Sequence, residues 1–176
     1  MMTGRRELEK KAREIRKLSI ISISRAGSGH PGGSLSSADV LAALYFGCMN
    51  IRPDEPWWKD RDRFVMSKGH GCPALYAALA LRGYFPVEEL MHLRQLGAML
   101  QGHPCSKKTP GIDVSTGSLG QGLSQANGIA LAGRLDKKDF YTYCLMGDGE
   151  LEEGQVWEAA MTAAHYKLDH VIAFID

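Results

Sequence analysis

Residues 140–176 read FYTYCLMGDGELEEGQVWEAAMTAAHYKLDHVIAFID. Two short apolar runs, Phe140–Met146 and His170–Ile175, predict strands, and the intervening Gly154–His165 predicts a helix. Two strands joined through a crossover helix pair in parallel, and apolar parallel strands are covered by helices on both faces. The stretch therefore predicts an α/β fold with a parallel sheet and helices on both faces.

The rest of the chain is predicted to be mainly helical. Apolar residues recur with a period of 3.6 over residues 5–25, and glycines and Pro31 break this helix at 27–33. Because the 22-residue segment 97–118 is rich in Gly, Pro, Lys and Ser, it predicts a functional or disordered loop. We expect one domain over residues 1–176. The other expected elements are helices over 36–49, 73–82, 86–96 and 119–135, a strand over 63–67, and a loop over 53–62.

The composition excludes several classes of protein. Hydrophobic residues make up 44% of the chain and charged residues 23%, with a net charge of +1. This balance is typical of a globular protein and does not favour binding to nucleic acid or to an acidic membrane. We expect a cytoplasmic protein, because no apolar run is long enough to span a membrane and no secretory leader is evident. The four cysteines form no Cys-x-x-Cys pair and are expected to be small buried hydrophobes.

The segment Gly147-Asp148-Gly149 follows an apolar strand. A residue in this position lies at the carboxyl edge of a parallel sheet, where α/β folds bind ligands. One carboxylate between glycines suits Mg²⁺, which binds one or two carboxylates together with phosphate oxygens and water. The acidic residues after this segment precede a helix, whose dipole also favours negative charge there.

Three of the six histidines, His30, His70 and His103, directly follow a glycine in segments expected to be loops. A histidine on such a loop is accessible to a ligand and titrates near neutral pH. The alternative is that Gly-His only marks turns. A three-histidine zinc site is a further alternative, although the spacing matches no zinc motif. His92, His165 and His170 fall on expected helices or strands and are interpreted as surface or core residues.

Two glycine-rich segments need separate interpretations. Residues 27–32, GSGHPG, match a dinucleotide-binding fingerprint, but no strand precedes them and Pro31 removes a backbone N–H, so we reject that function. Residues 116–122, TGSLGQG, precede an expected helix. Their backbone N–H groups could face an anion or a ring, or the glycines could allow close helix packing. The sequence leaves both alternatives open.

Taken together, five segments resemble the N-terminal, diphosphate-binding part of transketolase. They occur in family order and with family spacing, from residue 28 to the last residue. The segments are Ser28–Gly33, Lys68–His70, Gly102–Pro104, Ser115–Gly122 and Gly147–Ala159.

The resemblance implies a thiamine-diphosphate-binding fold, with thiamine diphosphate and a divalent cation, Mg²⁺ or else Ca²⁺ or Mn²⁺, as cofactors. It implies that His30, His70 and His103 are active-site histidines and that Asp148 is the metal ligand. Glu153 matches an acidic residue that links two cofactor sites across the dimer. The implied cofactor-binding residues are His70, Gly117, Leu119, Asp148, Gly149 and Glu153.

The resemblance also implies an activity: transfer of a two-carbon ketol unit from a ketose phosphate to an aldose phosphate. This requires a pyrimidine-binding partner, either a C-terminal domain or the second subunit of a split transketolase, in a homodimer or heterotetramer. The family's second metal ligand, an asparagine, would lie beyond Asp176. We therefore expect an incomplete domain that binds the cofactor weakly when isolated.

Two alternatives to this function stay open. One is another thiamine-diphosphate enzyme, such as a deoxyxylulose-phosphate synthase or an E1 dehydrogenase subunit. The other is a fragment that docks to a partner and catalyses nothing by itself.

Overall fold

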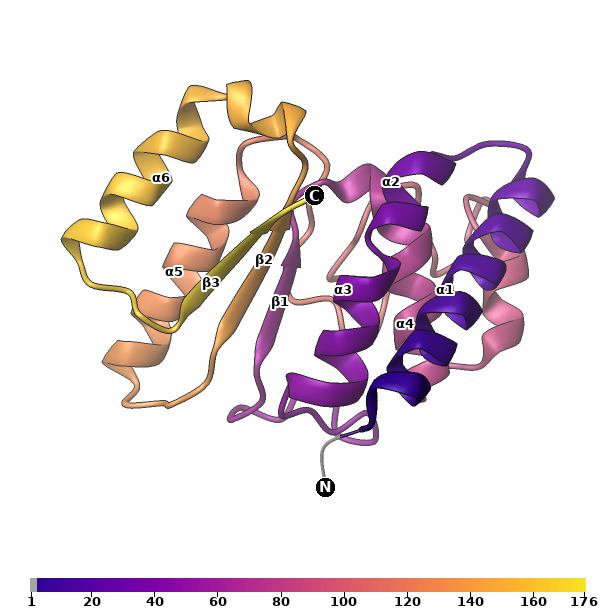
Figure 1. Cartoon of the computed structure of the whole chain (residues 1–176), viewed down its shortest axis with the longest axis horizontal. Helices are drawn as coiled ribbons and strands as arrows, with labels where there is room; N and C mark the ends of the chain where they lie inside the picture. The colour runs from indigo at the N-terminus through magenta and orange to yellow at the C-terminus, as the bar shows by residue number, and fades with distance from the viewer. Residues whose placement is uncertain (1–2) are drawn as a thin grey trace.

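The computed structural model describes residues 3–176, in which a parallel sheet separates two groups of helices (Figure 1). The elements combine α-helices and strands with short 3₁₀ helices (η2, η3, η4) and one π-helix (η1). Their bounds, in chain order, are α1 Arg5–Ala26, α2 Pro31–Ser36, α3 Ala38–Ala43, η1 Leu44–Cys48, β1 Arg63–Met66, η2 Gly69–Gly71, α4 Cys72–Arg82, η3 Val87–His92, α5 Gly122–Leu135, β2 Thr142–Met146, η4 Gly149–Glu152, α6 Gly154–His165 and β3 Val171–Ile175.

The sheet has the order β1-β2-β3, and both pairs are parallel. Arg63 lies opposite Thr142, which in turn lies opposite Val171. Because all three strands run in the same direction, their carboxyl ends meet at one edge of the sheet. The segments that follow the three strands are therefore brought together there.

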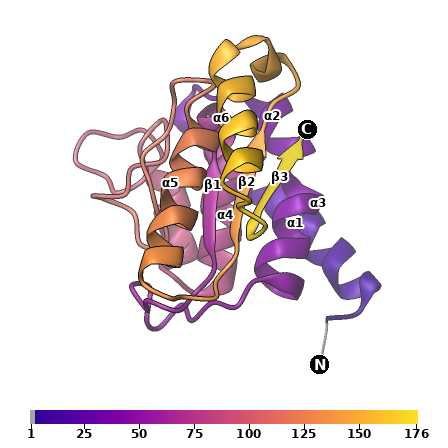
Figure 2. The same cartoon turned by 90° about the vertical axis from the view of Figure 1, so that its left-hand side faces the viewer.

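Alternate residues of the strands enter two separate cores. Tyr143 and Leu145 of β2 pack with the helices α1, α3 and α4, whereas Cys144 and Met146 pack with α5 and α6. Figure 2 shows α5 and α6 in front of the sheet, with the other helices behind it. The prediction of a parallel sheet with helices on both faces is therefore confirmed.

Several predicted boundaries were wrong. The single helix expected over residues 36–49 begins two residues later, at Ala38, and consists of α3 followed by the π-helical turn η1, while Ser36 ends α2. Pro31, expected only to break a helix, occupies the first turn of α2, where its missing N–H removes no helix hydrogen bond. The helix expected over 86–96 is the short 3₁₀ helix η3, and α5 begins at Gly122, three residues later than expected.

The burial of β3 and of the cysteines also differs from expectation. On β3, Ile172 and Ile175 are 36% and 59% exposed, so this strand is less covered than β1 and β2. Cys72 and Cys144 are buried, and burial raises the pKa of each thiol to about 12. Cys48, in contrast, is exposed. No helix within residues 3–176 combines the length and apolar character needed to cross a membrane.

The centre of β2 makes a testable contribution to stability. Leu145 is fully buried, so Leu145→Ala should lower the free energy of unfolding by about 2–5 kcal/mol. Leu135→Ala is the matched control, because Leu135 is 84% exposed and should change the value by less than about 0.5 kcal/mol. Urea unfolding measures both. Equal effects would contradict the placement of β2 in the core.

Candidate active site

A cleft lies at the carboxyl edge of the sheet, where the three strands end. Lys68 follows β1, Asp148 follows β2 and Asp176 follows β3. The cleft has a volume of about 440 Å³, which is within the range of small-molecule sites. Its walls are formed by Gly33, Ser36, Lys68, His70, Leu119, Gly147, Asp148, Gly149, Glu150 and Asp176.

A hydrogen-bonded ion pair closes one side of the cleft. Lys68, whose side chain is only 3% exposed, pairs with Asp176. The hydroxyl of Ser36 donates to Oδ2 of Asp176 at 2.8 Å. The hydroxyl of Ser37 lies 3.3 Å from the same oxygen and 2.6 Å from the carbonyl oxygen of Gly33, and it can donate to either. Burial by itself would raise the pKa of Asp176, but the hydrogen bonds from Lys68 and Ser36 outweigh it and lower the pKa. This network connects the ends of β1 and β3 to α2.

The three predicted histidines gather beside this cleft. The rings of His30 and His70 are 5.3 Å apart between centroids, in an edge-to-face arrangement. A side-chain carbon at Gly117 would stand 3.2 Å from the ring of His103, and one at Gly69 would stand 2.9 Å from the backbone nitrogen of Gly117. The segments that carry His70, Gly117 and His103 are therefore in direct contact.

The loop of His103 is held by buried side chains of α4. The hydroxyl of Tyr76 lies 3.0 Å from the carbonyl oxygens of both Gln101 and His103 and can donate to either. The thiol of Cys72 donates to the carbonyl of Gly102 at 3.2 Å. Tyr76 and Cys72 are fully buried. A rigid helix thus positions a histidine that lies far from it in the sequence.

The surroundings of His70 and His103 lower the pKa of both imidazoles. Burial, then the neighbouring His30 and Lys68, lower the pKa of His70. Burial, then Arg94 and His30, lower the pKa of His103. Both imidazoles are therefore neutral at neutral pH, and each can accept a proton.

Two glycines within residues 116–122 use their backbone donors within the protein. The N–H of Gly120 donates to Glu150 at 2.8 Å, and that of Gly122 donates to Ser67 at 3.1 Å. A side-chain carbon at Gly122 would overlap the hydroxyl oxygen of Ser67. Of the two alternatives left open by the sequence, close packing describes Gly120 and Gly122.

The predicted cofactor residues are not all in the same place. His70, Leu119, Asp148 and Gly149 line the cleft. Gly117 lies beside His103. Glu153 is exposed at the start of α6, where it packs against Gly120 rather than lining the cleft.

The surroundings of Asp148 suit a magnesium–diphosphate group. Asp148 is exposed at the cleft, and within residues 3–176 it forms no ion pair. A side-chain carbon at Gly149 would meet no atom within 4 Å, so a ligand can approach the backbone there. Lys68 lies in the same wall, where its charge is paired with Asp176, and Mg²⁺ favours one carboxylate with phosphate oxygens.

The zinc alternative finds no support in the described chain. Within residues 3–176, no three side chains of His, Cys, Asp or Glu are arranged to hold a metal ion. His92 and His165 are exposed and His170 is half-buried, which agrees with their interpretation as residues outside the site.

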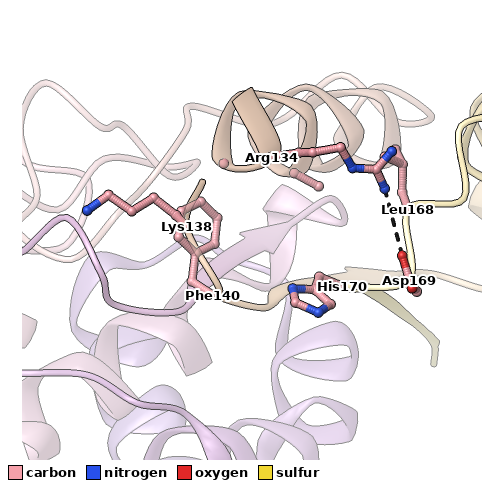
Figure 3. A pocket seen from close by; sticks show the side chains of 8 residues that line it. Arg134, Lys138, Phe140, Leu168, Asp169 and His170 are labelled. Atoms are coloured by element: carbon pink, nitrogen blue, oxygen red, sulfur yellow. Dashed lines mark ion pairs between the residues drawn. The ribbon is translucent and has the colours of Figure 1, made fainter. Parts of the chain in front are cut away.

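A second cavity, of about 230 Å³, lies near the starts of β2 and β3 (Figure 3). Its cations already have partners: Arg134 donates to the carbonyl of Tyr166 at 2.6 Å, and Lys138 pairs with Asp60 at 2.6 Å. Among the described residues, its lining includes none of the predicted site residues. The chemistry predicted from the sequence therefore gathers at the opposite edge of the sheet.

Three charged residues of the cleft were missed by the sequence analysis as site residues. Lys68 and Asp176 follow strands at the same edge of the sheet, the same signal that identified Asp148. Glu150 is one of three acidic residues before the helix, for two of which the helix dipole was a sufficient explanation, yet it is buried in the cleft wall.

Comparisons with known proteins identify the family of the chain. Residues 8–176 match the family model described as transketolase, thiamine diphosphate binding domain. A 6-deoxy-6-sulfo-D-fructose transketolase subunit (SqwG) of Clostridium sp. is 56% identical over 97% of this chain and 62% of its own length. One of the subunits of the apulose-4-phosphate transketolase of Phocaeicola vulgatus is 48% identical over 96% of this chain and 60% of its own length. The chain thus spans about 60% of these relatives.

Solved structures agree as well. The transketolase of Leishmania mexicana superposes with a TM-score of 0.91 at 39% identity, over all of this chain and 28% of that protein. The sequence resemblance and the fold therefore lead to the same family. The chain belongs to the transketolase family, and its residues 8–176 match the thiamine diphosphate binding domain of that family.

Proposed function

We propose that this chain forms the diphosphate-binding side of a transketolase active site, as one incomplete domain over residues 1–176. The observation that carries the proposal is the convergence of Asp148, Lys68 and His70 on one cleft at the carboxyl edge of the sheet. The family match supports the proposal. The assembled enzyme, in the cytoplasm, moves a two-carbon ketol unit between sugar phosphates.

The chain's residues take two kinds of role in this proposal. Asp148 would ligate Mg²⁺, and the ion pair of Lys68 with Asp176 fixes the adjoining wall of the cleft. When bound, thiamine diphosphate would supply a nucleophilic carbon and an electron sink for the transfer. His30, His70 and His103 orient the sugar and move protons to and from its oxygen atoms.

The other predicted site residues surround the cofactor or face the partner. Gly117 and Leu119 lie near the aminopyrimidine ring, Gly149 lets the cofactor approach the backbone, and Glu153 faces the partner across a dimer interface. The partner is a pyrimidine-binding domain or subunit, in a homodimer or heterotetramer. It supplies the glutamate that activates the cofactor and most groups that grip the substrate's anionic tail.

The identity of the sugar substrates is a separate question from the type of reaction. Two relatives are named for a sulfonated ketose and for apulose 4-phosphate. We infer a donor with an anionic tail, either phosphate or sulfonate. Ketol transfer from phosphorylated ketoses, 6-deoxy-6-sulfofructose and apulose 4-phosphate should therefore be compared in one panel.

Reconstitution tests the proposal. The full-length protein mixed with its pyrimidine-binding subunit, thiamine diphosphate and Mg²⁺ should transfer ketol units, and each component alone should not. Aldose formation measured by coupled assay gives the rate. Decarboxylation of pyruvate in the same mixture would support a deoxyxylulose-phosphate-synthase-like or E1-like enzyme instead, and no turnover with any donor would support the non-catalytic alternative.

A further inference from the structure

Glu150 joins three segments of the cleft, and the function proposed above gives it no role. From its contacts we propose that Glu150 is a positioning residue, which fixes the ends of β1 and β2 and the approach to α5 relative to one another. The nature of the ligand in the cleft rests on the proposed function. The positioning itself rests on the protein's own hydrogen bonds.

The carboxylate of Glu150 accepts hydrogen bonds from three different places in the chain. Its Oε1 accepts the N–H of Gly120 at 2.8 Å and the hydroxyl of Ser67. Its Oε2 accepts the N–H of Gly147 at 3.0 Å. The residue is only 2% exposed, and a buried carboxylate persists where donors of this kind surround it.

Each of the three partners adjoins a residue that lines the cleft. A displacement of any partner therefore moves the neighbouring cleft residue along with it. The adjoining pairs are Ser67 and Lys68, Leu119 and Gly120, and Gly147 and Asp148.

Ser67 is itself fixed by close packing. It accepts the N–H of Gly122 at 3.1 Å while it donates to Glu150. The start of α5 leaves no room for movement, because even one additional carbon at Gly122 would overlap Ser67. The chain of hydrogen bonds from Gly122 through Ser67 to Glu150 thus connects a rigid helix to the cleft.

The substitution Glu150→Gln preserves the shape of the side chain but prevents it from accepting all three hydrogen bonds. One accepting oxygen becomes an N–H₂ donor, which faces donors and leaves at least one of them unpaired. The negative charge is lost as well. Because Glu150 acts on His70 by raising its pKa against the effect of burial, Glu150→Gln should lower the pKa of His70 further.

The experiment uses the full-length protein assembled with its pyrimidine-binding partner. Glu150→Gln should weaken thiamine diphosphate binding with Mg²⁺ by at least 10-fold in calorimetry. The pKa of His70, followed by NMR without ligand, should decrease. The matched control is Glu152→Gln, since Glu152 is exposed on the same 3₁₀ helix, and it should change neither value.

A double-mutant cycle separates positioning from general damage. Ser67→Ala alone should weaken binding by about 3-fold, and adding it to Glu150→Gln should cost less than that, because both changes disrupt one network. Unchanged affinity and an unchanged His70 titration in Glu150→Gln would overturn the proposal, as would fully additive effects. If Glu150→Gln fails to fold, Ser67→Ala decides: an affinity equal to that of the natural protein overturns the proposal.

The readouts also separate this inference from the proposed function. An assembly can bind the cofactor and show both effects of Glu150→Gln, weaker cofactor binding and a lower pKa of His70. If that assembly transfers no ketol unit, the result contradicts the proposed function alone. If the assembly binds no thiamine diphosphate at all, the pKa of His70 in the natural protein and in Glu150→Gln can still be compared, and an unchanged value would count against the inference.

Discussion

Asparagine in place of Asp148 is expected to weaken the binding of thiamine diphosphate with Mg²⁺ by at least about 100-fold in the assembled enzyme. Asp148 is the carboxylate that directly follows the central strand β2, and it lies at the cleft without an ion pair among the described residues. An amide keeps the size of the side chain but removes the negative charge that strengthens the binding of a hard divalent cation. Ketol transfer should decline in parallel at fixed cofactor concentration.

Calorimetric titration of the assembled enzyme measures this effect. Asp54→Asn serves as the control, because Asp54 is exposed in a loop between η1 and β1, and it should leave the affinity unchanged. Titrations with Mg²⁺, Ca²⁺ and Mn²⁺ should all show the loss in Asp148→Asn. An affinity within about 3-fold of the natural enzyme would contradict the assignment of Asp148 as a metal ligand, since even supporting residues around a metal usually contribute about 10-fold.

The fold could be predicted where sequence patterns reflect burial directly. The apolar runs of β2 and β3, separated by one helix, were sufficient to predict parallel pairing. The helix expected over residues 36–49 was placed two residues too early, because apolar spacing does not mark the turn at Ser37 that separates α2 from α3. Side-chain spacing does not reveal that the backbone also changes to a π-helical turn at Leu44–Cys48.

The candidate site was predictable to the extent that its residues follow strands or occur in repeated Gly-His segments. Asp148 and His70 belong to this group, whereas Leu119 was predicted only from the family resemblance, and all three meet at one cleft. Glu150 could not be found in this way, because its partner Ser67 is 83 residues away and a glutamate before a helix already has a simple local explanation. Only the folded chain shows that its carboxylate is buried.

His103→Asn is expected to lower kcat/KM for ketol transfer by about 10²- to 10⁴-fold, the usual contribution of a proton-transferring side chain. The pH profile of the natural enzyme should show an acid limb below the ordinary histidine value of about 6.5. The direction follows from the lowered pKa of His103 and His70. The neutral imidazoles persist at neutral pH, and activity is lost as the pH decreases through these lowered values. His92→Asn, at an exposed position of helix η3, should change neither rate nor profile.

Arg94 allows the electrostatic cause of that acid limb to be tested separately. After burial, its positive charge is the largest influence that lowers the pKa of His103, and its guanidinium lies 3.5 Å from the carbonyl oxygen of Gly102. Removing the charge by Arg94→Gln should therefore raise the pKa of His103 and move the acid limb to higher pH. Arg94→Lys retains a positive charge and should move the limb less. If both variants gave the profile of the natural enzyme, protonation of His103 would not limit the reaction at low pH, and a different group would have to account for the acid limb.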